Sequence, residues 1–126
     1  MPNIDDLIRD KLSKDGQVLN LKAAFLREVG AKELAKREEL KEVRALDLSQ
    51  NGIGDEGVRA LAESDVLPNL RNLNLASNNI SDEGAKHIGI GLEKNTSLNQ
   101  LNLNNNKISD EIDKNIEIVL KKKTKK

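Results

Sequence analysis

The chain has 126 residues, which is enough for one domain with a single continuous core but not for two. Charged residues make up 33% of it and no apolar run is long enough to span a bilayer, so we exclude a membrane-spanning protein. The sequence has no cysteine, which excludes disulfide bonds and thiol chemistry, and its formal net charge is zero.

The first segment with a clear pattern is residues 3–13. Ile4, Leu7, Ile8 and Leu12 recur at helical spacing behind Asn3, a residue type that commonly caps a helix. Acidic residues follow in the first turn, where they suit the helix dipole and argue against an anionic membrane surface. We predict a helix that caps the N-terminal end of the fold, with a partner-binding helix as the alternative. No secretory signal is visible, so we expect a cytoplasmic protein, including one delivered to a host cytosol.

Residues 16–42 form a degenerate copy of a unit that recurs three times downstream. Five of its positions match the next copy at one offset of 27 residues, namely Leu19, Leu21, Leu26, Gly30 and Leu34. Gly16 stands where the later copies have an aliphatic residue, and Ala24 stands where they have asparagine. The alternative is a single helix through residues 21–40, which its Ala, Lys, Glu and Leu content would suit. The five matches favour a degenerate repeat.

Three clear copies follow as residues 43–69, 70–97 and 98–120. They align Leu46, Leu73 and Leu101 at spacings of 27 and then 28 residues. Their shared pattern, LxxLxLxxNxIxxxGxxxL, resembles the leucine-rich repeat, and the unit length is similar to that of the ribonuclease-inhibitor-like subclass. The resemblance implies an α/β fold. It would be a right-handed solenoid, a short horseshoe segment with a parallel sheet on the concave side and helices on the convex side.

Elementary geometry explains why this spacing produces stacked units. The alternation of a strand sends both leucines of LxL to one face, and a helical return path covers that face with its own apolar residues. One repeat cannot bury its apolar face alone, so neighbouring copies must stack. We expect a monomeric domain over residues 1–120, with residues 1–15 as its N-terminal cap. The helix of residues 98–120 would pack back on the core as the C-terminal cap.

Asparagine recurs where each clear copy turns out of its strand. A buried amide carries donors and an acceptor, so it can satisfy backbone groups that a turn leaves unpaired. The resemblance implies that Asn51, Asn78 and Asn106 form a structural ladder of this kind. Gly57 and Gly84 follow in the helical part, where they would permit close helix packing.

The last six residues, 121–126, hold five of the 21 basic residues and no acid. The body before them therefore carries 16 basic and 21 acidic residues. We interpret this segment as a solvated, disordered tail, because short charge runs usually are. The alternative is weak, salt-sensitive anion binding, without specific nucleic-acid recognition because no aromatic residue accompanies the lysines.

The sequence offers no enzyme site, metal site or cofactor motif. His87 is the only histidine, and its place in the repeat predicts a helix surface. The acidic pairs that begin at Asp55, Asp82 and Asp110 recur because they start equivalent helices, where acids are favoured. Catalysis and transition-metal binding would need convergent groups that this pattern sets far apart.

We therefore predict a non-enzymatic protein-interaction module, an adaptor, regulator or effector. Leucine-rich repeats generally bind proteins on the concave sheet face, and the resemblance implies the same here. The residues so nominated are Asn20, Lys22, Arg44, Ala45, Asp47, Ser49, Arg71, Asn72, Asn74, Ala76, Asn99, Gln100, Asn102 and Asn104. This face has no aromatic ring, so modest affinity for an unidentified partner is expected. The alternative is a mainly structural or remnant solenoid unit without a dedicated partner.

Overall fold

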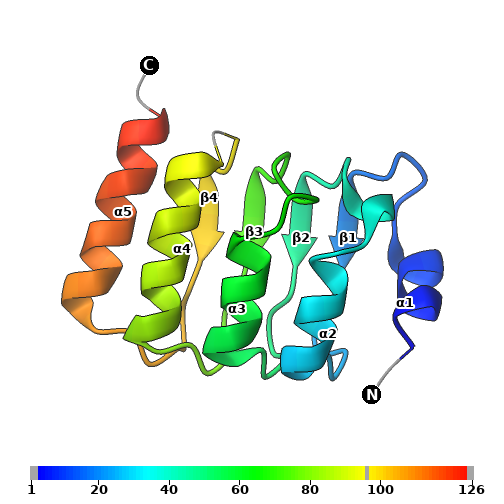
Figure 1. Ribbon diagram of the computed structural model, residues 1–126, viewed down its shortest axis with the longest axis horizontal. Helices are drawn as coiled ribbons and strands as arrows, with labels where there is room; N and C mark the ends of the chain where they lie inside the picture. The colour runs from blue at the N-terminus through cyan, green and yellow to red at the C-terminus, as the bar shows by residue number, and fades with distance from the viewer. Residues whose placement is uncertain (1–2, 96, 125–126) are drawn as a thin grey trace.

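The computed structural model describes residues 3–95 and 97–124, which form a sheet with a row of helices along one of its faces (Figure 1). The strands are β1 (Val18–Asn20), β2 (Ala45–Asp47), β3 (Asn72–Asn74) and β4 (Gln100–Asn102). The helices are α1 (Ile4–Lys11), α2 (Arg27–Leu34), α3 (Gly54–Ala62), α4 (Asp82–Lys94) and α5 (Asp110–Thr124), with a short 3-10 helix at Glu38–Leu40. A bilayer-spanning helix is absent from this described part of the chain, where each helix is too short or too polar.

The strands are parallel and lie in chain order, β1-β2-β3-β4, so each strand pairs with the next repeat's strand. In this register Leu19 lies beside Leu46, Leu46 beside Leu73 and Leu73 beside Leu101. The pairing that the repeat spacing predicts is therefore the pairing that the chain adopts. The fold is an α/β leucine-rich-repeat solenoid.

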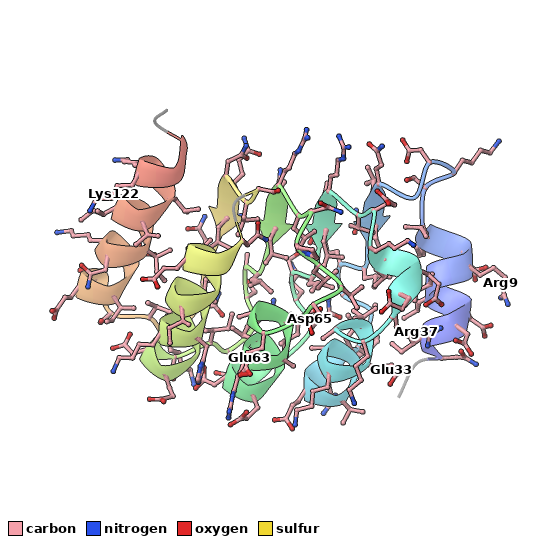
Figure 2. All side chains as sticks on the ribbon, turned by 45° about the horizontal axis from the view of Figure 1, so that its top comes forward. Arg9, Glu33, Arg37, Glu63, Asp65 and Lys122 are labelled. Atoms are coloured by element: carbon pink, nitrogen blue, oxygen red, sulfur yellow. The ribbon has the colours of Figure 1, made fainter. Side chains whose placement is uncertain are left out.

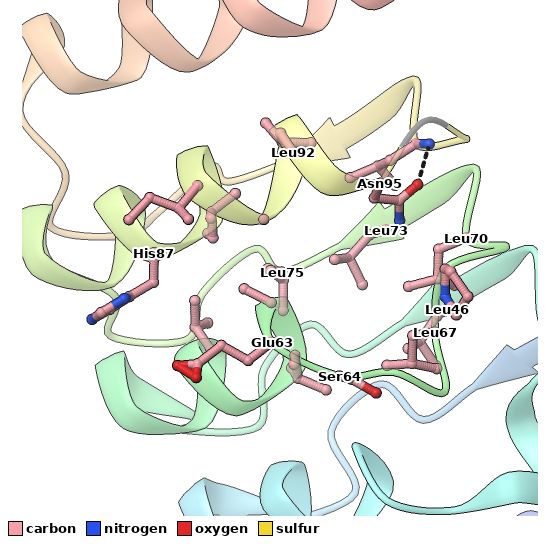
Figure 3. Close-up of a pocket in the computed structure, with 18 of the residues that line it drawn as sticks. Leu46, Glu63, Ser64, Leu67, Leu70, Leu73, Leu75, His87, Leu92 and Asn95 are labelled. Carbon is pink, nitrogen blue, oxygen red and sulfur yellow. Dashed lines mark hydrogen bonds between the residues drawn. The ribbon is translucent and has the colours of Figure 1, made fainter.

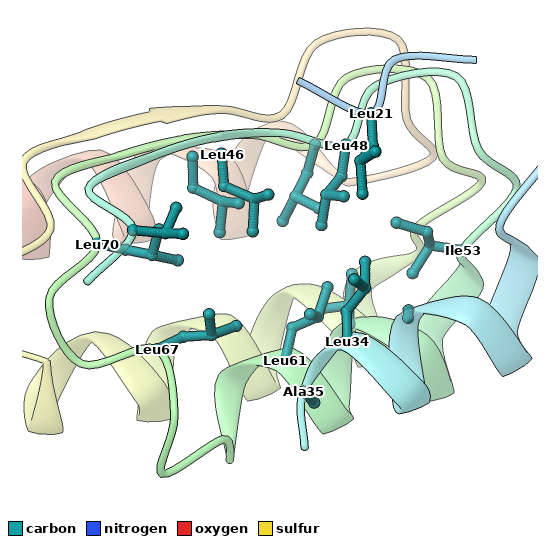
Figure 4. Packing of buried hydrophobic residues seen from close by; sticks show 14 of the residues in the cluster. Leu21, Leu34, Ala35, Leu46, Leu48, Ile53, Leu61, Leu67 and Leu70 are labelled. Atoms are coloured by element: carbon teal, nitrogen blue, oxygen red, sulfur yellow. The ribbon is translucent and has the colours of Figure 1, made fainter. Parts of the chain in front are cut away.

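The core lies between the sheet and the helix row, where aliphatic side chains from both layers meet (Figure 4). Leu48 after β2 and Ile53 at the start of α3 are fully buried there. Gly57 lets α3 approach its neighbour, because a Cβ at this position would lie 3.2 Å from the Ala31 Cβ of α2 and would clash with Ile53. Adjacent helices therefore pack at a distance that the small residues on their facing sides permit.

The degenerate copy at residues 16–42 contributes a full strand and helix. β1 is the first strand of the sheet, and of the alternative long helix only Arg27–Leu34 is α-helical, followed by the 3-10 turn at Glu38–Leu40. Two of its backbone amides, those of Ala24 and Leu26, donate to the side-chain oxygen of Asn51 in the next repeat. Residues 21–26 stay outside the helix despite their helix propensity, because Leu21 and Leu26 are buried in the shared core.

α1 covers the N-terminal end of the solenoid. The side chain of Asn3 caps this helix by accepting a hydrogen bond from Asp6 N–H at 3.2 Å. Ile4 and Ile8 are 4% and 6% exposed against the core. Arg37, which lies beside α1 in Figure 2, forms ion pairs with Glu33, with Glu39 and, across to α1, with Asp5. Apolar and charged contacts together hold α1 in place.

The C-terminal end differs from expectation in two respects. The sequence predicts a tail from residue 121, but α5 continues through Thr124, because lysine is a good helix former and a cation suits the C-terminal end of a helix. Residues 125 and 126 of that predicted tail lie outside the described residues. α5 also closes the end only in part: it buries Ile116, whereas Leu103 and Ile108 stay half-buried.

Candidate functional site

Asparagine side chains link successive repeats inside the solenoid. The Asn51 side-chain oxygen accepts hydrogen bonds from Ala24 N–H at 2.9 Å and Leu26 N–H at 3.2 Å. Its nitrogen donates to the carbonyls of Leu21 at 2.8 Å and Leu48 at 3.0 Å. Asn51 thus satisfies the backbone of its own turn and of the preceding one.

The same arrangement repeats one and two units further on. Asn78 accepts from Asn51 N–H at 3.0 Å and Ile53 N–H at 3.3 Å, and Asn106 accepts from Asn78 N–H and Ile80 N–H at 2.9 and 3.0 Å. Asn78 is fully buried, and every buried side-chain polar atom in the described residues has a hydrogen-bond partner. The side-chain amides of the ladder are therefore engaged in holding the fold together.

A second column of polar residues lies on the sheet face itself, and it too makes backbone contacts. Asn20, Asp47, Asn74 and Asn102 occupy equivalent positions at the ends of β1 to β4. In each, a side-chain oxygen accepts a hydrogen bond at 2.9 to 3.0 Å from the amide two residues later. This is an Asx turn, a local bond that ends a strand. Part of the predicted binding face therefore shapes the turns.

Ser49 is a correction to the predicted binding face. The sequence places it among the exposed residues, but it is only 5% exposed. Its hydroxyl donates to Asp47 Oδ1 at 2.7 Å, and its carbonyl accepts from Ala23 N–H at 3.0 Å. The turn after β2 folds the serine inward, so it contacts its neighbours and is not available to a partner.

The residues at the entry to the strands are the exposed ones. Arg44, Arg71 and Asn99 are all exposed and are stacked through their backbones. The Arg44 carbonyl accepts from Arg71 N–H at 2.8 Å, and the Arg71 carbonyl accepts from Asn99 N–H at 3.0 Å. Because neighbouring strands lie about 5 Å apart, the two arginines occupy adjacent positions on this edge. They are the strongest anchor candidates on the concave face.

Amide side chains extend this exposed region across β3 and β4. Asn72 Nδ2 donates to Gln100 Oε1 at 2.7 Å, and both residues are exposed. Lys22 and Asn104 are exposed further along the face, while Ala76 is half-buried. The structure thus brings the two arginines and the amide pair into one polar surface and separates that surface from the turn-forming column.

A third polar column joins the starts of the helices, where the sequence pattern alone indicates only acids that suit the helix dipole. Asp55 accepts from Ser81 N–H at 2.8 Å and from Ser81 Oγ at 2.5 Å, and Asp82 accepts from Ser109 N–H at 2.6 Å. Burial opposes ionisation of Asp55, but the hydrogen bonds from Ser81 and from the Gly84 amide outweigh it and lower the pKa of the carboxyl. The signal in the sequence is the serine that precedes each acid of the next repeat.

A cavity of about 780 Å³ lies under the sheet, between α3, α4 and the segment that joins α3 to β3 (Figure 3). Most of its wall is apolar, formed by the core leucines of both layers. His87 and Glu63 line it from α4 and from the end of α3. The described residues contain no group of three or more His, Cys, Asp or Glu side chains that could hold a metal ion. The mostly apolar lining suits apolar packing.

In-register parallel strands at 27- and 28-residue steps, joined by a buried amide ladder, define a repeat solenoid, a non-enzymatic protein-interaction fold. The family model described as Leucine Rich repeat matches residues 43–62, 66–89 and 94–112, half of the sequence. The chain therefore belongs to the leucine-rich-repeat family. A search of curated proteins gave no match.

Two solved structures resemble the fold. One is Leiomodin-1 Actin-Binding Site 2, which superimposes with a TM-score of 0.75 at 18% identity, covering 96% of this chain and 75% of that one. The other is a tropomodulin C-terminal domain from Caenorhabditis elegans, with a TM-score of 0.53 at 17% identity, covering 97% of this chain and 93% of that one. At these identities the similarity concerns the fold.

Proposed function

We propose that this chain is a protein-binding module whose concave edge, formed by Arg44, Arg71, Asn72, Asn99 and Gln100, contacts the partner. The observation that carries the proposal is the pair of exposed arginines that directly precede the adjacent strands β2 and β3. Exposed arginine is a common anchor of protein interfaces, and two guanidinium groups side by side suit carboxylates on a partner. The amides beside them supply donors and acceptors.

The expected complex is of modest affinity. The edge carries no aromatic residue, and four strands of three residues each offer less than the roughly 800 Å² per partner of a standard interface. Since Asn20, Asp47, Asn74 and Asn102 use their oxygens in turns, they contribute mainly shape. A partner that approaches the arginine edge gains more than one that lies along the middle of the sheet.

Two finer assignments accompany this proposal. The steps of 27 and 28 residues and a helix in every return path support the ribonuclease-inhibitor-like subclass. Actin is the first partner to test, because one of the similar structures is named as an actin-binding site and the fold overlaps it along 96% of this chain.

The test compares two double variants with the unmodified chain in cosedimentation with filamentous actin and in capture from a lysate. Arg44→Glu with Arg71→Glu reverses both anchors, and Lys36→Glu with Lys86→Glu makes the same change in charge at exposed positions on the helix side. We expect the anchor variant to lose the partner at least about tenfold and the control to retain it. Equal binding by all three proteins would overturn the concave-edge proposal.

A further inference from the structure

Phe25 is the only Phe, Tyr or Trp of the sequence, and its side chain is 76% exposed. Val29, four residues further along in α2, is a second exposed apolar side chain, at 58%. A large apolar side chain stabilises a fold by leaving water, and a ring this exposed contributes little of that stabilisation. Packing of the core therefore does not explain Phe25.

The backbone at this position is also unfavourable for a large side chain. Phe25 and Arg27 both have a φ of 57°, in the left-handed region that bulky residues rarely adopt. One repeat later the equivalent residues are Gly52 and Gly54, with φ of 61° and 70°. Glycine adopts this conformation without a steric cost. The chain thus places two large side chains where the same turn in the next repeat has glycine.

The asparagine ladder holds the turn in this strained conformation. The Asn51 side-chain oxygen accepts from the amides on either side of Phe25, those of Ala24 at 2.9 Å and Leu26 at 3.2 Å. The Asn51 carbonyl accepts from Arg27 N–H at 2.7 Å. These bonds fix the backbone whichever side chain stands at position 25, so the strain persists. A strained and exposed aromatic residue indicates a contact with a partner.

A groove of about 450 Å³ lies beside this turn, between α1 and the segment that follows β1. Leu7 and Lys11 line it from α1, and Leu21, Lys22 and Ala24 line it from the segment after β1. Its apolar residues form a recess next to the exposed ring, and its two lysines are exposed. The groove and the ring together form one continuous stretch of surface.

The charges on this surface are positive and unpaired. Lys11 and Lys22 in the groove and Arg27 beyond the ring form no ion pair with any other residue that the structure describes. Asp10 and Glu28, the acids next to them in the sequence, are each already ion-paired. An apolar recess flanked by unpaired cations is complementary to carboxylates that lie beside an apolar side chain.

We propose that Phe25 and this groove form a second docking site, which takes an acidic segment of a partner protein. An apolar side chain of the segment would cover Leu7, its carboxylates would pair with Lys11 and Lys22, and Phe25 would insert into an apolar part of the partner. An anionic membrane fits less well, because it is flat and the exposed acids of α1 would face it. The site lies at the opposite end of the strands from the arginine edge and does not depend on it.

Selection from a displayed library of short random peptides tests the site. Panning on the unmodified chain should enrich peptides that place Asp or Glu beside a large apolar residue. The Kd of these peptides, measured by fluorescence anisotropy, should rise about tenfold or more for Phe25→Asn. Lys11→Glu with Lys22→Glu should raise it by a similar factor, because like charges then meet in the groove.

Melting temperature separates an anchor from a structural residue. Asn79 stands two repeats beyond Phe25 with a φ of 60°, so asparagine suits this conformation. Phe25→Asn should therefore relieve strain and raise the melting temperature by about 2 °C or more while it weakens peptide binding. A residue that served the fold alone would show a lower melting temperature when replaced.

Matched variants separate this site from other surfaces. Lys36→Glu with Lys86→Glu makes the same charge change at exposed positions elsewhere, and Ile90→Ala truncates an apolar side chain that is 57% exposed on α4. Both should bind the peptides as the unmodified chain does. Arg44→Glu with Arg71→Glu should also retain them, which distinguishes this site from the arginine edge.

Four outcomes would overturn the proposal. The first is that panning enriches no acidic peptides, and the second is that the enriched peptides bind Phe25→Asn as tightly as the unmodified chain. The third is that they lose affinity only for the variant of the arginine edge. The fourth is that the chain cosediments with phosphatidylserine vesicles through Phe25, which would assign the surface to a membrane.

Discussion

The two ends of this solenoid face the same physical problem and differ in how far they solve it. A stack of repeats exposes its core wherever the stack stops. At the N-terminal end a separate helix, α1, crosses that core and buries Ile4 and Ile8. At the C-terminal end the last helix, α5, stays in the helix row beside α4, and Leu103 and Ile108 remain half-buried.

In this chain the helix that leaves the helix row covers the strand edge, and the helix that stays in the row covers it only in part. α1 precedes the first strand and turns back across it, as the antiparallel bridge between Leu12 and Leu19 records. α5 has the position and spacing of a repeat helix, so its apolar stripe is used against α4 and the core. Its outer side carries Asp113 and Glu117, which keep that side polar without covering the strand edge.

The largest predicted difference in stability between the interior of the solenoid and its C-terminal end concerns the asparagine ladder. Asn78→Ala removes the acceptor of the Asn51 and Ile53 amides in a fully buried site, and we expect a loss of about 3 to 4 kcal/mol in the free energy of unfolding. Asn106→Ala makes the same deletion at the last rung, where the asparagine side chain is only half-buried and water can take its place, and should cost about 1 kcal/mol.

Urea unfolding followed by circular dichroism measures both variants. Loss of a single buried ladder residue should also leave a cooperative transition, because every repeat shares one core. Equal losses for Asn78→Ala and Asn106→Ala would show that the C-terminal end is as well covered as the interior, and the contrast between the two ends would fail.

The next largest predicted losses in the free energy of unfolding are for one variant in α1 and one in α5, which compares the two end helices directly. Ile8→Ala removes a side chain that is 6% exposed between α1 and the core, and we expect a loss of about 2 to 3 kcal/mol. Leu120→Ala truncates a half-buried residue of α5 and should cost about 1 kcal/mol. Chemical denaturation measures the pair, and a greater loss for Leu120→Ala would reverse the assignment of the stronger cap.

The sequence predicts the architecture well because the architecture depends on repetition. Leu46, Leu73 and Leu101 recur with the same neighbours, so one physical argument places all three in adjacent parallel strands, and the structure confirms it. The degenerate copy supports the same register through Leu19 although Ala24 replaces its asparagine. The apolar pattern still predicts the strand register when one polar position of a repeat is replaced, as at Ala24, because the buried leucines of that repeat are unchanged.

The candidate site is less predictable, since a polar residue on a strand has more than one use. Alternation places Asp47 and Ser49 near the concave face, but it does not reveal that the serine hydroxyl turns inward to the carboxylate. Strand alternation also does not distinguish Arg44, which is exposed, from Asn74, whose side-chain oxygen accepts a hydrogen bond that closes a turn. These outcomes depend on local side-chain hydrogen bonds to the backbone, which compete with hydrogen bonds to water. The residue type alone does not determine which of the two forms.

A smaller loss of stability is predicted for the polar column that links the starts of the helices, in which Asp55 accepts hydrogen bonds from Ser81. The lowered pKa of Asp55 means that its ionised form stabilises the fold, so this contribution is present above pH 3.8 and is lost as the pH falls through the lowered value. Asp55→Asn should cost about 1 kcal/mol at about pH 7 and less at about pH 3. Asp110→Asn, at the open end where no described serine follows, is the matched control in urea unfolding. A cost for Asp55→Asn that does not change with pH would contradict the role of the charge.

The smallest effect concerns the charged contact that ties α1 to the body of the solenoid. The carboxylates of Glu39 and Asp5 raise the pKa of Arg37, but exposed ion pairs contribute little because water and salt screen them. Asp5→Asn should lower the melting temperature by less than about 2 °C, and salt near about 1 M should abolish the difference. Asp6→Asn, whose partner Arg9 lies within α1, is the control because its loss breaks no contact between elements. If both variants melt alike at low salt, apolar contacts alone hold the N-terminal cap, and the two ends differ only in how much core each helix covers.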